Sequence, residues 1–125
     1  MRAYATTRIA LVVEDDVLLR SDIVSELQSH GWLVLETPTG EGALALLRTH
    51  HVDVVFTDIQ LAGRLNGWDV AEVLHDADCD LPIIYTSGAP ADPARRPDGS
   101  VFFNKPYDSA EVVKACGRLA GAGSH

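Results

Sequence analysis

Several features that mark particular protein classes are absent or rare in this sequence. No apolar run approaches the roughly 20 residues that a membrane-spanning helix needs, and residues 1–8 contain no apolar core of the signal-peptide type. The two cysteines, Cys79 and Cys116, do not have the spacing of a metal site. We therefore expect a cytoplasmic protein without membrane contact, in which both thiols stay reduced.

Basic residues are also scarce. Ten Lys and Arg stand against 18 Asp and Glu, which gives a formal net charge of −8. Because nucleic-acid affinity depends largely on neutralising phosphates, this balance argues against direct binding of DNA or RNA. At 125 residues, we expect one domain, residues 1–125 with a core of about 9–120, and no second folded output module.

Short apolar runs alternate with amphipathic segments along nearly the whole chain. We predict strands at residues 9–13, 32–35, 52–57, 81–86 and 101–103, with segments of helical period between them and a last helix at 108–120. The first and third runs are almost continuously apolar, as is typical of central strands covered on both faces. This alternation predicts an α/β fold, a flavodoxin-like doubly wound (βα)5 three-layer sandwich with a parallel five-stranded sheet of order 2-1-3-4-5.

Local signals mark several helix ends. Asp16 is a plausible N-cap of the first helix and Gly31 a plausible residue just past its end, while Asp108 and Glu111 have the spacing of a capping box. Residues 88–100 depart from the pattern because they contain three prolines. Proline disrupts helices, so we expect the fourth helix to be short or irregular.

Acidic residues follow two of the predicted central strands. Glu14 and Asp15 come directly after the first strand, and Asp58 comes directly after the third. The carboxyl ends of adjacent parallel strands meet at one edge of the sheet, so these carboxylates should lie together. Their mutual repulsion favours a hard divalent cation with oxygen ligands. We expect Mg²⁺, for which Mn²⁺ can substitute.

A hydroxyl and an ammonium group are expected at the same edge. Ser87, preceded by Thr86, lies at the end of the fourth strand, and Lys105 follows the fifth. A carboxylate can attack a phosphoryl group while a metal, a lysine and a hydroxyl hold the charge on its oxygens. The set of residues therefore predicts phosphoryl transfer to a carboxylate.

Four stretches of the chain carry a resemblance to a known family. Leu-Val-Val-Glu-Asp-Asp at 11–16, Asp-Val-Val-Phe-Thr-Asp at 53–58, Pro-Ile-Ile-Tyr-Thr-Ser-Gly at 82–88 and Phe-Asn-Lys-Pro at 103–106 resemble the signature regions of response-regulator receiver domains. They occur in the family's order and spacing, and the similarity covers roughly residues 9–120. The resemblance implies a stand-alone receiver in a two-component phosphorelay that is phosphorylated in a Mg²⁺-dependent reaction and signals through protein contacts.

The resemblance also implies roles for individual residues. Asp58 would be the phospho-acceptor and a metal ligand. Asp15 would bind Mg²⁺ directly and Glu14 through a water, and Gln60 would supply a backbone carbonyl ligand.

Further roles follow from the last two signature regions. Ser87 and Lys105 would hold the phosphoryl group, with Thr86 as the alternative hydroxyl if the register differs by one. Phe102 would be a switching aromatic, although an aromatic residue in a terminal strand is often simply core. The Lys105–Pro106 bond would be cis.

The implied partners are a histidine kinase or a histidine phosphotransfer protein and an unidentified downstream protein. The resemblance further implies that the chain is a monomer or weak dimer and that it is not a turnover enzyme. One alternative is a phosphohydrolase resembling haloacid dehalogenases, with Asp58 as nucleophile, but those enzymes have a second Asp where this chain has Gln60. The other is a binding module that has lost phosphorylation. The retained Glu14, Asp15, Asp58 and Lys105 argue against it.

Overall fold

The computed structural model describes residues 7–61, 63–77, 80–88 and 101–122. In these residues, strands and helices follow one another as β1 (Ile9–Val13), α1 (Val17–Ser29), β2 (Leu33–Thr37), α2 (Gly40–Thr49), β3 (Val54–Asp58), α3 (Gly67–Asp76), β4 (Ile83–Ser87), β5 (Val101–Asn104) and α4 (Ser109–Ala122). All neighbouring strands pair in parallel, in the order β2-β1-β3-β4-β5. The predicted fold class is confirmed.

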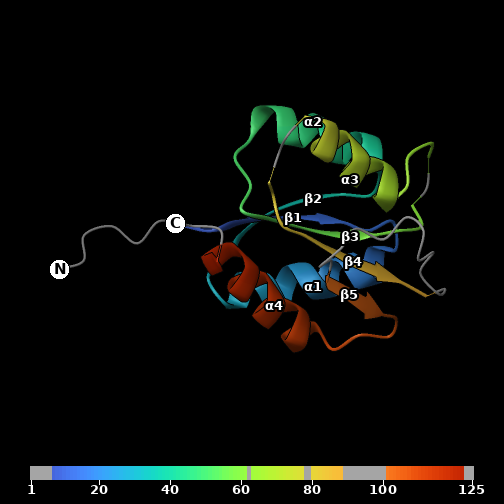
Figure 1. The fold of residues 1–125 in the computed structure, drawn as a ribbon. Coiled ribbons are helices and arrows are strands. Elements are labelled where there is room, and N and C mark those ends of the chain that lie inside the picture. Colours follow the sequence, from blue (N-terminus) through green and yellow to red (C-terminus); the bar gives the residue numbers. More distant parts are fainter. Residues whose placement is uncertain (1–6, 62, 78–79, 89–100, 123–125) are drawn as a thin grey trace.

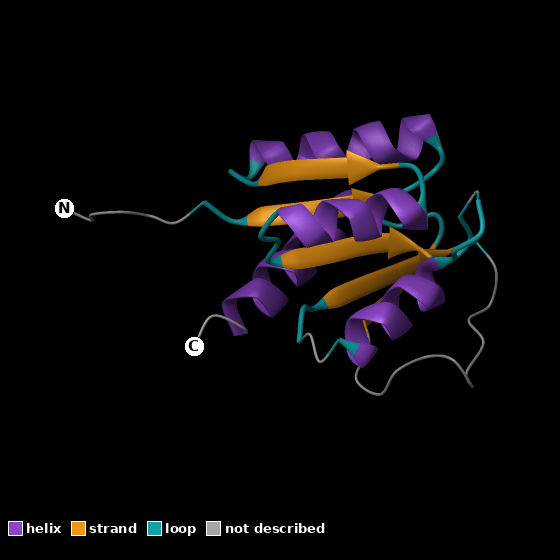
Figure 2. Ribbon diagram, turned by 90° about the horizontal axis from the view of Figure 1, so that it is seen from above, coloured by secondary structure: helices purple, strands orange, loops and turns teal. Residues whose placement is uncertain are grey.

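The sheet lies between two layers of helices. Helices α2 and α3 cover one face and α1 and α4 cover the other, as Figure 1 shows, and the strands run in a common direction when seen from above (Figure 2). Strands β1 and β3 are buried almost throughout, because each has strand neighbours on both sides and helices on both faces. In β1, Val12 packs into the core toward α1 and α4, whereas Leu11 and Val13 pack toward α2.

β1 has the predicted bounds, whereas the bounds of the other four strands differ from the predicted ones by at most two residues. β2 begins at Leu33 because Trp32, although buried, donates its backbone N–H to Leu27 at the end of α1 (3.1 Å) rather than to the sheet. β3 is shifted toward its carboxyl end and includes Asp58. The predicted acceptor is therefore the last residue of a buried strand, and its backbone is held by the sheet.

The predicted ends of α1 are confirmed. The Asp16 carboxylate accepts the backbone N–H groups of Leu18 and Leu19 at 3.0 and 3.1 Å, and Gly31 has a φ of 89° just after the C-cap, a conformation that glycine adopts without steric cost. The expectation of a short or irregular fourth helix concerns residues 89–100, which lie outside the described residues. In the part that is described, no helix is long and apolar enough to cross a bilayer.

The predicted capping box of the last helix is wrong. Asp108 caps α4 by accepting the Ala110 N–H at 2.9 Å, but the Glu111 carboxylate turns outward to Lys114 (3.2 Å). A capping box forms instead at the start of α3, where Asn66 and Asp69 each accept the other's backbone N–H. This pair positions the start of α3, the helix that follows β3.

Candidate functional site

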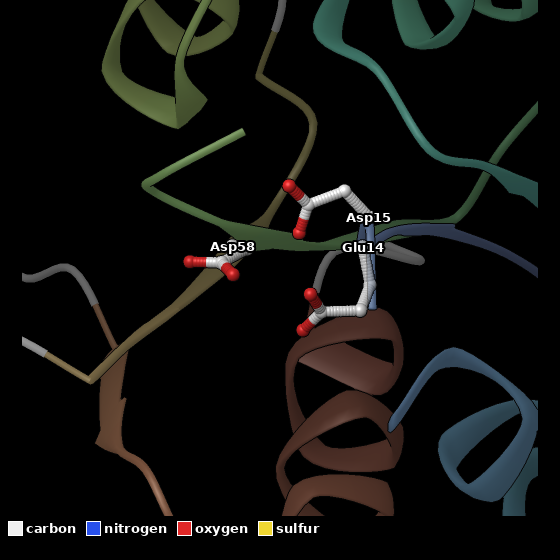
Figure 3. Close-up of side chains that lie close together, drawn as sticks. All are labelled: Glu14, Asp15 and Asp58. Carbon is white, nitrogen blue, oxygen red and sulfur yellow. The ribbon is translucent and has the colours of Figure 1, made fainter. Parts of the chain in front are cut away.

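Three carboxylates meet at the carboxyl edge of the sheet. Glu14 and Asp15 extend from the end of β1 and Asp58 from the end of the adjacent β3 (Figure 3). Each offers an oxygen that lies within 4.8 Å of those of the other two. Glu14 and Asp58 are buried, at 0% and 3% exposure, whereas Asp15 is exposed. The structure thus brings together the three acidic residues that the strand-end pattern predicted, with one of them open to solvent.

Lys105 compensates the two buried carboxylates. Its Nζ lies 2.7 Å from Oδ2 of Asp58 and 3.0 Å from Oε1 of Glu14, and its side chain is 20% exposed. Burial alone would lower the pKa of Lys105, but its contacts with Asp58 and Glu14 outweigh burial and raise that pKa. Lys105 therefore stays charged. When all three carboxylates are ionised, they and the one ammonium leave two negative charges, which match a divalent cation with oxygen ligands.

Glu14 is the most perturbed group of the cluster. Burial raises the pKa of its carboxyl to about 7, and the Asp16 N–H, which it accepts at 3.1 Å, and Lys105 only partly oppose this effect. Its Oε1 faces Lys105 as an ion pair but forms no well-aligned hydrogen bond. The Glu14 carboxylate thus lacks full compensation from the described residues, and a second cation at this edge would stabilise its charged form.

The loop between Asp58 and α3 turns back onto the end of β3. Oδ1 of Asp58 accepts the Gln60 N–H at 3.0 Å, and the Gly67 N–H donates to the Ile59 carbonyl at 2.8 Å, which closes the loop before α3. A Cβ on Gly67 would lie only 2.6 Å from the Asp58 carbonyl oxygen. Glycine at this position is what lets α3 begin against the end of β3. The predicted role of the Gln60 carbonyl as a metal ligand stays a prediction.

The two candidate hydroxyls lie on neighbouring positions of β4. Thr86 stands opposite Asp58 in the sheet, and Ser87, at the carboxyl end of the strand, stands opposite Asn104. Both are buried. The Ser87 carbonyl accepts the Lys105 N–H at 2.9 Å, which connects the predicted phosphoryl-binding residues directly. The Lys105–Pro106 bond is cis, as the family resemblance implied.

Phe102 belongs to an aromatic cluster that the sequence did not reveal. Ile59, Trp68 and Tyr85 form a buried group at the start of α3, and the half-buried Phe102 packs against it. The rings of Trp68 and Tyr85 lie 4.5 Å apart. The sequence carried no local signal for this cluster, because its rings come from three separate elements, α3, β4 and β5. A switching role for Phe102 remains a prediction.

Arg20 lies close to the site, and the sequence analysis did not single it out. Its Nη1 donates to the Glu14 backbone carbonyl at 2.7 Å and its Nε to Oε1 of Glu36 at 3.1 Å. The sequence offered a weak signal, a basic residue six positions after Glu14 in an acidic chain. Arg20 contacts the same β1–α1 turn that carries two of the three carboxylates.

A hollow of about 580 Å³ lies away from this site. It is lined by residues that precede the amino ends of β3 and β4, among them His50, His51, Asp53 and Asp80, and by apolar residues of α2 and α3. It contains none of the carboxylates described above.

Comparison with known proteins gives consistent similarities. The family model described as response regulator receiver domain matches residues 10–116. Heme response regulator HssR of Staphylococcus aureus is 30% identical over 107 residues, 82% of this chain but 47% of that protein, so the chain spans less than half of its length. A solved response regulator receiver protein from Sinorhizobium medicae is 31% identical, with a TM-score of 0.85 over 93% of this chain and 96% of that one. The receiver domain of a Pseudomonas aeruginosa sensor histidine kinase, solved with magnesium in its active site cleft, shares the fold at 22% identity, covering 93% of this chain and 99% of that one with a TM-score of 0.78.

Proposed function

Because this chain belongs to the response regulator receiver domain family, we propose that it accepts a phosphoryl group on Asp58 in a Mg²⁺-dependent reaction and signals through protein contacts. The observation that carries this proposal is the setting of Asp58, a buried strand-end carboxylate within reach of Glu14, Asp15 and Lys105. The Pseudomonas receiver with magnesium in its cleft supports the choice of metal.

In the proposed reaction, Asp58 is the nucleophile. One of its oxygens forms a bond to phosphorus while the P–N bond of a phosphohistidine on the partner breaks, and the departing imidazole keeps the electron pair. Lys105 and the Ser87 hydroxyl would hold phosphoryl oxygens at the strand ends. Glu14, Asp15, Asp58 and the Gln60 carbonyl would hold Mg²⁺, which neutralises charge on the phosphoryl oxygens when bound.

The proposal extends to the setting in which the protein acts. The phosphoryl donor would be a histidine kinase or a histidine phosphotransfer protein, and the receiver, a monomer or weak dimer, would act in the cytoplasm on another protein rather than on nucleic acid. Turnover of a free substrate is not part of the proposed function.

The test follows the phosphoryl group by intact mass. Wild type and Asp58→Asn are incubated with an acyl phosphate donor, with Mg²⁺ or with EDTA. We expect one phosphoryl group per wild-type chain, decaying slowly and formed with Mg²⁺ only, and none on the variant. Asp76→Asn, which removes an exposed carboxylate at the end of α3, is the matched control and should behave as wild type.

The alternative functions give different results in the same experiment. Repeated consumption of the donor without a lasting adduct would indicate a phosphohydrolase. Absence of any adduct on the wild type, with both the acyl phosphate and a phosphorylated histidine kinase as donors, would indicate a binding module that has lost phosphorylation and would contradict the proposal.

A further inference from the structure

The Arg20 side chain folds back from α1 onto the turn that precedes the helix. Its backbone N–H donates to the Asp16 carbonyl at 2.9 Å, the first hydrogen bond of α1. Its guanidinium reaches the Glu14 carbonyl through Nη1 and Glu36 on β2 through Nε. The side chain is only 18% exposed. Arg20 thus ties the helix, the preceding turn and the edge strand together.

Arg20 holds the one peptide unit of the turn that its neighbours leave unsupported. The Glu14 N–H donates to the Thr37 carbonyl at 3.1 Å, and the Asp16 carboxylate is engaged in capping α1. Between them lies the peptide unit that joins Glu14 to Asp15. Its carbonyl oxygen and the Asp15 Cα lie in one plane, so the contact at 2.7 Å holds the direction of the N–Cα bond from which the Asp15 side chain is carried.

The Asp15 carboxylate depends on the backbone for its position. It is exposed, and among the described residues neither a hydrogen bond nor an ion pair to this carboxylate is formed, in contrast to Glu14 and Asp58. A ligand that approaches a metal from a fixed peptide loses less conformational freedom on binding than one from a mobile turn. Anchoring of the turn should therefore strengthen metal binding.

We propose that Arg20 is a positioning residue for the divalent cation, acting through the Glu14–Asp15 peptide, and that Glu36 holds the guanidinium in place. This inference rests on the proposed function, because it requires Mg²⁺ at the acidic edge. The observations that carry it are the bond from Arg20 to the Glu14 carbonyl and the lack of lateral support for Asp15 from the described residues.

Charge alone predicts the opposite effect. A guanidinium close to three carboxylates repels an incoming cation, so its removal should tighten Mg²⁺ binding if Arg20 acted only through its charge. A positioning role predicts weaker binding on removal. The sign of the change in Mg²⁺ affinity therefore distinguishes the two actions.

The experiment measures Mg²⁺ binding to the unphosphorylated full chain by isothermal titration calorimetry. We expect Arg20→Gln to raise the Kd about tenfold, as for residues that orient metal ligands from outside the coordination shell. Arg20→Lys keeps the charge but loses the planar fork that reaches both acceptors, so it should also raise the Kd. Arg48→Gln removes an equal charge from the exposed end of α2 and should leave the Kd unchanged.

Each outcome decides the inference. An Arg20→Gln Kd equal to or below that of wild type would overturn it, and if that variant does not fold, Arg20→Lys decides by the same criterion. Backbone amide resonances of metal-free Arg20→Lys should shift at Asp15, and unchanged resonances there would also overturn the inference. Failure of wild type itself to bind Mg²⁺ would refute the proposed metal site and this inference with it, whereas normal wild-type binding with unchanged variants would refute the inference alone.

Discussion

Replacement of Glu14 by glutamine should change how the stability of the metal-free protein depends on pH. Burial raises the pKa of Glu14 from its ordinary 4.5 to about 7 in the folded protein. Between these two values the folded state retains a proton that the unfolded state has released. Stability contributed by the protonated carboxyl is therefore complete below pH 4.5 and is lost as the pH rises toward 7.

The size of this loss follows from the shift in pKa. Each unit corresponds to about 1.4 kcal/mol, so the ionisation of Glu14 should lower the free energy of unfolding by about 3 kcal/mol across this range. The glutamine side chain of the variant has nearly the same shape and does not titrate. The Glu14→Gln protein should therefore lack this decline, and its stability relative to wild type should grow with pH.

Urea denaturation of both proteins in EDTA, at intervals from pH 4.5 to above 7, measures the difference. Saturating Mg²⁺ should restore much of the wild-type stability, because a cation then takes over the role of the proton. The two proteins share every other titrating group, so the difference between their curves isolates Glu14. Parallel curves in EDTA would refute the reasoning.

Three further substitutions test the same edge of the sheet. Lys105→Met leaves two buried carboxylates without their cation and should cost about 3 kcal/mol in urea denaturation with EDTA; a loss no larger than that of a surface substitution would contradict the pairing. Gly67→Ala places a Cβ against the Asp58 carbonyl, so it should lower the free energy of unfolding by about 2 kcal/mol and slow phosphorylation by an acyl phosphate. The control is Gly121→Ala, where a Cβ meets no atom within 4 Å; it should leave the stability unchanged or raise it by up to about 1 kcal/mol. Asp15→Asn should change stability by less than about 0.5 kcal/mol but weaken Mg²⁺ binding strongly in calorimetry, and unchanged binding would exclude Asp15 as a ligand.

Much of the fold could be predicted from local patterns. The apolar runs that form β1 and β3 indicate central strands, because a strand covered by helices on both faces has no solvent-exposed face for polar side chains. Parallel strands joined by helices place all their carboxyl ends at one edge. From these two facts alone, Glu14, Asp15 and Asp58 were expected to meet, and they do.

The predictions failed where two hydrogen-bonding or ion-pairing partners were available to the same group, because a sequence pattern does not show which partner is chosen. Glu111 has the spacing of a capping partner, but Lys114 one helical turn away offers an opposite charge, and the carboxylate turns to it. Trp32 looks like the start of a strand, but its N–H closes the end of α1. In each case two partners were available within a few residues, and only the three-dimensional arrangement decided between them.

The sequence by itself determined the class of the fold and the identity of the residues at the acidic edge, because hydrophobic period and strand ends are properties of short segments. The tertiary structure decided how the charges of those residues are paired and how their backbone is held. Lys105 reaches Asp58 across 47 positions of the chain, burial leaves Glu14 with a pKa of about 7, and Arg20 folds back to the Glu14 carbonyl. These features depend on solvent exclusion and on distances of a few ångströms between separate elements, which no short segment of the sequence encodes.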